Sequence, residues 1–297
     1  QDVEVAYMTN NVNWHADYVL TLDADDKLGD LAGWVTVDNK SGATYRNSVL
    51  KVVAGQVNVA TPQRNMLMKA QAMEVMSDAA GAGPQFHEQA LFEYHMYDLK
   101  RKTTIKDGQT KQISLLGAAA VPMLKEFVIE GQGGWWYTRQ FSDPDAKQPV
   151  NVVMSFRNSE VGHLGMPLPA GTIRLYKKDH DGNAQFIGED NVRHTPKDEE
   201  VRLKVGEAFD VVAERRQTAF QRVSNRVYES EWEIHIRNHK AEDIVVYVVE
   251  SLAGFSDWSI TQHSHPFTKP DAARARFEVP VAKDGEAVLT YTSQVNY

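Results

Sequence analysis

Apolar and polar residues alternate with a period of two wherever this 297-residue chain has a regular pattern. The clearest example is residues 231–237, which read Glu-Trp-Glu-Ile-His-Ile-Arg. In a strand, Trp232, Ile234 and Ile236 share one face, while the charged residues and His235 share the other. Residues 150–156, 201–205 and 275–281 alternate in the same way. This period predicts strands that each bury one face, and it does not suit amphipathic helices.

Turn dipeptides separate the alternating segments. Asp-Gly occurs at 107–108, 181–182 and 284–285, and glycine adopts the positive φ that tight hairpin turns need. Strands of about 5–8 residues, with turns about 8–12 residues apart, are typical of sandwiches rather than of βαβ units. We therefore expect an all-β fold of tandem, antiparallel, immunoglobulin-like β-sandwich domains.

The length of the chain suits two domains of about 100–200 residues each. Residues 141–149 are rich in proline and polar side chains, so we place a linker there. The expected domains are 1–147 and 148–297, with an alternative further division near 217–228. Residues 62–84 are rich in Met and Ala and are expected to form a loop insertion in the first domain that is dispensable for folding.

Three alternating segments, 35–39, 154–158 and 234–238, end in asparagine before a turn. Repetition of a structural module would explain this echo. Ordinary turn chemistry would explain it as well, because asparagine is favoured in turns. The residues leave both interpretations open.

Composition excludes several kinds of partner and site. The net charge is −8, so there is no basic field for nucleic acid or anionic lipid. No apolar run approaches the roughly 20 residues that cross a bilayer, so we expect no transmembrane segment. The chain has no cysteine, which excludes disulfides and thiolate chemistry but leaves the compartment open. Strand-like alternation begins by Val3, and we expect that a leader or an earlier domain preceded Gln1.

Two kinds of metal site are weighed and neither is favoured. His263 and His265 would project from one face of a strand, with His194 as a third ligand, but Pro266 indicates a turn there. Acidic residues at 23–30 and 179–189 offer oxygen ligands for calcium without the spacing of a twelve-residue calcium loop. Hairpin turns explain the same residues, so we expect no cofactor.

Motifs of catalysis are missing from the sequence. It has no Gly-x-Ser-x-Gly elbow, no phosphate loop and no dinucleotide fingerprint. Adjacent carboxylates such as Glu199 and Glu200 point to opposite faces of a strand and cannot flank one bond. We expect a non-catalytic protein, and the alternative is a metal-dependent hydrolase that uses His263, His265 and nearby carboxylates.

The main apolar feature is the run Trp135-Trp136-Tyr137, which follows a glycine-rich stretch. If the run is a strand, Trp135 and Tyr137 lie on one face and Trp136 on the other. A sandwich sheet buries only one face in its own core, so a neighbouring domain, a partner or a ligand must cover the remainder. The favoured interpretation is burial between the two halves of the chain, and the alternative is a ligand or partner surface.

Several blocks resemble a bacterial family known as domain of unknown function 4139, which also forms the C-terminal part of mucoidy inhibitor A-like proteins. The blocks that carry the resemblance span nearly the whole chain: 11–18, 31–35, 91–99, 103–105, 109–113, 188–190, 194–199, 209–214 and 237–239. The resemblance implies an exported, β-rich protein in the periplasm, the outer envelope or the medium, and it supplies no catalytic residues. We therefore expect a binding or assembly module whose partner is a protein, a glycan or a second copy of the chain.

Overall fold

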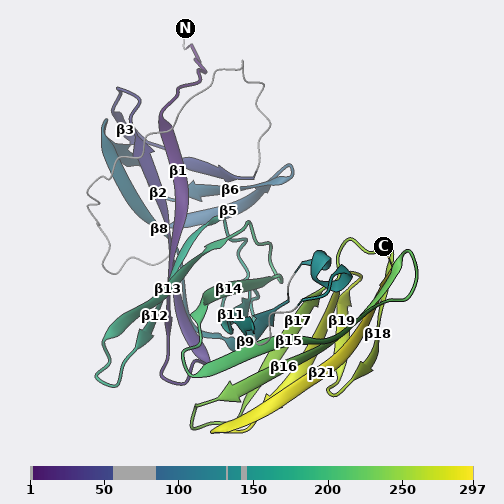
Figure 1. The fold of residues 1–297 in the computed structure, drawn as a ribbon. Coiled ribbons are helices and arrows are strands. Elements are labelled where there is room, and N and C mark those ends of the chain that lie inside the picture. The colour runs from purple at the N-terminus through teal and green to yellow at the C-terminus, as the bar shows by residue number, and fades with distance from the viewer. Residues whose placement is uncertain (1–2, 56–84, 132, 142–145, 297) are drawn as a thin grey trace. The chain divides into compact units, whose positions relative to one another are not determined.

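The computed structural model describes residues 3–55, 85–131, 133–141 and 146–296 (Figure 1). Apart from one short 3₁₀ turn, η1 (Gly134–Thr138), every regular element in these ranges is a strand, so the prediction of an all-β fold is confirmed. The strands are β1 (Val12–Leu22), β2 (Leu28–Asn39), β3 (Tyr45–Ser48), β4 (Lys51–Ala54), β5 (Phe86–Leu91), β6 (Tyr94–Leu99), β7 (Thr103–Ile105), β8 (Gln109–Pro122), β9 (Leu124–Glu130), β10 (Ala146–Gln148), β11 (Asn151–Arg157), β12 (Gly171–Lys178), β13 (Ala184–Val192), β14 (Glu200–Glu207), β15 (Val211–Arg222), β16 (Val227–Asn238), β17 (Ile244–Ser251), β18 (Asp257–His263), β19 (Phe267–Asp271), β20 (Arg274–Val281) and β21 (Gly285–Asn296). No helix among the described residues has the length and hydropathy needed to span a bilayer.

The chain divides into two compact units, and each unit is made of two separate segments. Unit 1 comprises 1–124 and 155–203, and unit 2 comprises 125–154 and 204–297. The sequence instead places one boundary at 147/148, in an expected linker. Residues 146–148 in fact form β10, which pairs with β15 inside unit 2. The division falls within strands, where no shift in composition marks it.

Two other expectations concern the extent of the domains. Residues 217–228 lie in the hairpin of β15 and β16, so the described chain does not divide there. The Met- and Ala-rich segment 62–84 lies outside the described residues.

In unit 1, one five-stranded sheet has the order β13-β12-β1-β2-β8. Strand β1 is antiparallel to β2 and parallel to β12. Alternation sends Tyr18, Leu20 and Val35 into the core, where each is almost fully buried, and leaves mostly polar side chains on the opposite face. Strands β3 and β7, and the trio β4-β6-β5, form two smaller sheets.

In unit 2, two sheets enclose a common hydrophobic core. One has the order β10-β15-β16-β21-β18, and the other has the order β14-β11-β9-β17-β20-β19. Trp232, Ile234 and Ile236 are buried in this core, so the face predicted from the alternation is confirmed. Val246 of β17 and Phe277 of β20 meet them from the second sheet.

The asparagines that end the three echoing segments make the same contacts. Asn39, Asn158 and Asn238 are each at most 1% exposed. In each case the amide Nδ2 donates to two successive carbonyls that precede another strand: Ile105 and Lys106 before β8, Thr195 and Pro196 before β14, and Val281 and Ala282 before β21. Each Nδ2 also bonds a carbonyl of its own following turn: Ala43, Met166 or Glu242. We call this arrangement the asparagine corner.

The asparagine corner occurs twice in unit 1 and once in unit 2 among the described residues, so the echo in the sequence reflects a repeated device. Each corner faces a segment with Lys-Asp in its sequence: Lys106-Asp107-Gly108, Lys197-Asp198-Glu199 and Lys283-Asp284-Gly285. One residue in each of these segments, Gly108, Asp198 or Asp284, has a positive φ, as tight turns require. Asparagine and Lys-Asp thus accompany each of the three corners in the sequence.

Candidate functional site

The aromatic run lies in η1 and not in a strand, so the two-faced arrangement considered for a strand does not apply. A 3₁₀ turn has about three residues per turn, so successive side chains point in three directions. Trp135 is 53% exposed, Trp136 is partly buried and Tyr137 is only 1% exposed. Gly134 allows the turn to approach the neighbouring loop, because a Cβ at this position would lie 2.9 Å from the Ala253 carbonyl oxygen.

Other aromatic residues of unit 2 cover Trp136. Its ring stacks on Phe141 with centroids 4.0 Å apart and lies 6.2 Å from the Trp232 ring. The Trp135 ring is 5.0 Å from Trp136 and 5.6 Å from Phe141. Phe141 and Trp232 therefore cover Trp136. They come from the two halves of the chain that the sequence suggested, and both lie in unit 2. Trp135 is left as the exposed member of this cluster.

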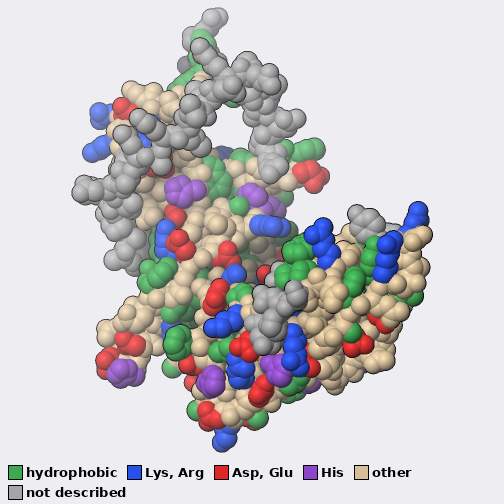
Figure 2. All heavy atoms as spheres, viewed as in Figure 1, with side chains coloured by type: hydrophobic (Ala, Val, Ile, Leu, Met, Phe, Trp, Pro, Cys, Tyr) green, Lys and Arg blue, Asp and Glu red, His purple; other side chains and the backbone are tan. Residues whose placement is uncertain are grey.

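A groove of about 510 Å³ opens beside Trp135. Its lining includes Trp135, Tyr228 and Phe255, with Thr138 and Arg139 as polar groups. Figure 2 shows hydrophobic and basic side chains gathered over the end of unit 2 where η1 lies in Figure 1. We call this feature the aromatic groove.

A buried polar network supports the turn that carries Trp135. The Tyr137 hydroxyl donates a 2.5 Å hydrogen bond to Glu250 Oε2. Glu250 Oε1 pairs with the Arg215 guanidinium, and Arg215 Nη2 donates to the Tyr291 hydroxyl at 2.8 Å. All of these side chains lie inside the core of unit 2. Four strands or turns are joined at this point, which fixes η1 against the sheets.

The electrostatics of this network keep its members in fixed protonation states. Burial raises the pKa of Tyr137 and that of Tyr291 well above the ordinary value. Burial alone would lower the pKa of Arg215, but Glu250, Tyr291 and Tyr137 together outweigh it and the pKa is raised. The guanidinium also lies 5.0 Å from the Trp232 ring. Both tyrosines are neutral and Arg215 is a fixed cation at physiological pH.

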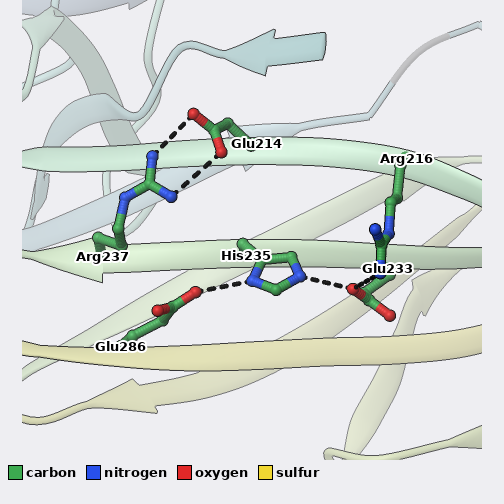
Figure 3. A network of polar contacts seen from close by, with 6 residues as sticks. All are labelled: Glu214, Arg216, Glu233, His235, Arg237 and Glu286. Atoms are coloured by element: carbon green, nitrogen blue, oxygen red, sulfur yellow. Dashed lines mark hydrogen bonds and ion pairs between the residues drawn. The ribbon is translucent and has the colours of Figure 1, made fainter. Parts of the chain in front are cut away.

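A second polar network lies on β15, β16 and β21, on the face opposite the buried Ile234 and Ile236 (Figure 3). Both ring nitrogens of His235 are hydrogen-bonded to carboxylates, Nδ1 to Glu286 at 2.7 Å and Nε2 to Glu233 at 2.5 Å. Glu286 first, and then Glu233, raises the pKa of His235. Arg216 pairs with Glu233 at 2.6 Å.

Arg237 forms a two-pronged pair with Glu214 in the same network, at 2.7 and 3.1 Å. Every carboxylate in Figure 3 is matched by a cation or an imidazole. The network therefore joins β15, β16 and β21 across the sheet.

The candidate metal-binding histidines make other contacts. His263 Nδ1 lies 2.9 Å from the His265 carbonyl, and His265 Nδ1 lies 2.8 Å from Ser264 Oγ. His194 belongs to unit 1, where Nδ1 accepts from the Ala170 amide at 3.1 Å. Within the described ranges, no three His, Asp or Glu side chains are grouped so as to hold a metal ion.

The acidic turns have partners within the protein. Asp179 accepts hydrogen bonds from the amides of Asp181 and Asn183, as in an ordinary hairpin turn. These bonds and the one from Gln185 lower the pKa of Asp179, with Gln185 the largest cause. Asp23 accepts from the amides of Lys27 and Leu28 in the same manner. Turn chemistry accounts for both acidic segments.

The sequence pattern indicated Trp135, Trp136 and Tyr137 but missed the residues that complete the groove. Arg139, Tyr228 and Phe255 come from three separate parts of the chain, and no spacing relates them. The buried network beneath η1 did have a signal in the sequence. Glu250 is a carboxylate at an inward position of the alternating segment 244–251, where an apolar residue is expected.

The fold and this site define an all-β protein with an aromatic groove on one unit. The chain belongs to the family described as domain of unknown function DUF4139, whose model matches residues 3–297. No curated protein matches the chain.

Proposed function

We propose that this protein is a non-catalytic binding module of the bacterial cell envelope, built from tandem immunoglobulin-like sandwiches, which takes a protein partner at the aromatic groove. The observation that carries the proposal is Trp135, 53% exposed at the side of a groove of about 510 Å³. An exposed indole beside a concave surface is a ready anchor for a partner.

The residues around the groove favour a protein partner. Trp, Tyr and Arg are the residue types most enriched where binding energy concentrates in protein interfaces, and Trp135, Tyr228 and Arg139 all line the groove. The turn beneath Trp135 is held by the buried bond from Tyr137 to Glu250. Little conformational freedom is then lost on binding, which favours affinity.

The charge at the groove indicates the chemistry of the partner segment. Arg139 is the charged residue in its lining, while the whole chain carries a net charge of −8. A segment that offers an apolar side chain to Trp135 and a carboxylate to Arg139 would match both features. The envelope location rests on the resemblance of the chain to exported proteins, including the C-terminal part of mucoidy inhibitor A-like proteins.

A photo-crosslinking amino acid at position 135, introduced into the intact protein in its native cell, tests this proposal. The matched control carries the same probe at Phe209, which is 96% exposed in the same unit. We expect one protein crosslinked from position 135, absent from position 209 and reduced in an Arg139→Ala background. Crosslinks only to a second copy, only to glycan or to nothing would each overturn the proposal.

The alternative, a metal-dependent hydrolase at His263, His265 and His194, is not favoured by any contact of these residues. Metal analysis of the purified protein tests it. Stoichiometric zinc, iron or copper that disappears in the His265→Ala variant would support the hydrolase against the binding module.

A further inference from the structure

A second groove, of about 670 Å³, lies on the outer face of the five-stranded sheet of unit 1. The register of β1, β2 and β8 builds it. His15 lies opposite Thr36, and Asn13 lies opposite Asp38; Gln112 lies opposite Thr36 on the other side. Because side chains alternate along each strand, these residues all face away from the core.

Hydrogen bonds hold the side chains of this groove in place. Asp17 Oδ2 accepts from Thr36 Oγ1 at 2.6 Å and lies 3.2 Å from His15 Nε2. Gln112 Nε2 in turn donates to Thr36 Oγ1 at 3.3 Å. Asp38 accepts from Thr110 Oγ1 at 2.5 Å. Thr36 is only 3% exposed, so this hydroxyl lies beneath the groove and supports it.

The charges along the groove are mixed. Asp17 and Asp38 contribute carboxylates, while Arg174 and Lys40 contribute cations. Arg174 Nη1 lies 3.9 Å from Asp17 Oδ1. A strongly charged ligand would therefore meet like charges on one side, whereas a neutral ligand with many hydroxyls finds donors and acceptors together.

The polar groups of this groove suit the hydroxyls of a sugar ring, because carboxylates accept hydrogen bonds from hydroxyls, and amides both donate to hydroxyls and accept from them.

We propose that this groove on unit 1 binds a neutral saccharide, with Asp38 and Gln112 bonding its hydroxyls. This site is separate from the aromatic groove of unit 2, which we assign to a protein partner. The protein would then hold a glycan and a protein on different units.

Titration of the full-length ¹⁵N-labelled protein with cellohexaose, maltohexaose and chitohexaose tests the proposal. We expect at least one hexasaccharide to shift the amide signals of β1, β2 and β8 at millimolar concentration. The Gln112→Ala and Asp38→Asn variants should weaken that binding about tenfold, while Gln185→Ala, on the β12–β13 hairpin of the same sheet, should not change it.

The same spectra show whether each variant is folded, so a loss of binding is not confused with unfolding. The Trp135→Ala variant should bind the saccharide normally, which separates this proposal from the one for unit 2. Absence of shifts with all three hexasaccharides, or shifts that the Gln112→Ala and Asp38→Asn variants leave unchanged, would overturn it.

Discussion

Arg215 and Glu250 form an ion pair inside the core of unit 2, with side chains that are 2% and 0% exposed. Tyr137 and Tyr291 each bond one member of the pair. Two buried charges are costly to desolvate, and these additional bonds offset part of that cost. The Arg215 Nε and Trp232 Nε1 atoms have no hydrogen-bond partner, so the network is not fully satisfied. Through Tyr137 the same network positions η1 against the strands.

Removing one member of the pair should destabilise the protein strongly. We expect Glu250→Leu or Arg215→Met alone to lower the free energy of unfolding by about 3–5 kcal/mol, because the remaining charge is left buried without its partner. The double variant should lose less than the sum of the two single losses. Urea denaturation of the four proteins measures this, and additive losses would contradict the pairing.

Four buried tyrosines should resist ionisation in the native protein. Burial raises the pKa of Tyr18, Tyr97, Tyr137 and Tyr291 above the ordinary value. After a rapid jump to about pH 11, absorbance at 295 nm follows the ionisation of tyrosine. These four should ionise only as the protein unfolds. A single fast phase that accounts for all 11 tyrosines would contradict the prediction.

The sign of the accompanying stability change follows from proton binding. Above about pH 10, unfolded tyrosines lose protons that the folded protein retains. The unfolded state then binds fewer protons, so stability falls as the pH rises. Below this pH range, ionisation of these tyrosines should make no contribution to the pH dependence of stability.

Alternation predicted the fold class and the buried face of β16 because burial in strands has a period of two. The same pattern could not predict η1, where Trp135, Trp136 and Tyr137 follow a turn that packing of Tyr137 against Glu250 stabilises. The division into units was also beyond the pattern. Contacts between distant segments define it, and no linker composition accompanies them.

The asparagine corners should be important for stability in both units. In the Asn39→Ala, Asn158→Ala and Asn238→Ala variants, several buried carbonyls lose their donor, and each such loss costs roughly 1–3 kcal/mol. We expect a loss of about 3 kcal/mol in each variant by urea denaturation, and little change in the exposed control Asn10→Ala. If any of the three variants matches the control, the corner at that position does not contribute as described.

His235 should titrate above its ordinary pKa, because Glu286 and Glu233 stabilise the imidazolium. The folded pKa exceeds the unfolded value of about 6.5, so this stabilisation is complete below that pH and is lost as the pH rises through the folded pKa. Its size should stay below about 1 kcal/mol, since Glu286 is 46% exposed. NMR titration of the imidazole measures the pKa, and Glu286→Gln should lower it. An unchanged pKa in that variant would contradict the assigned cause.

The two tryptophans of η1 should differ in what they contribute to stability. Trp136 packs between Phe141 and Trp232, so Trp136→Ala should cost about 3 kcal/mol of unfolding free energy through the cavity it leaves. Trp135 is 53% exposed, and Trp135→Ala should change the stability by less than about 1 kcal/mol. Urea denaturation of both variants measures the contrast. Equal losses would mean that Trp135 contributes to stability by packing, and its position beside the groove would then not support a binding role.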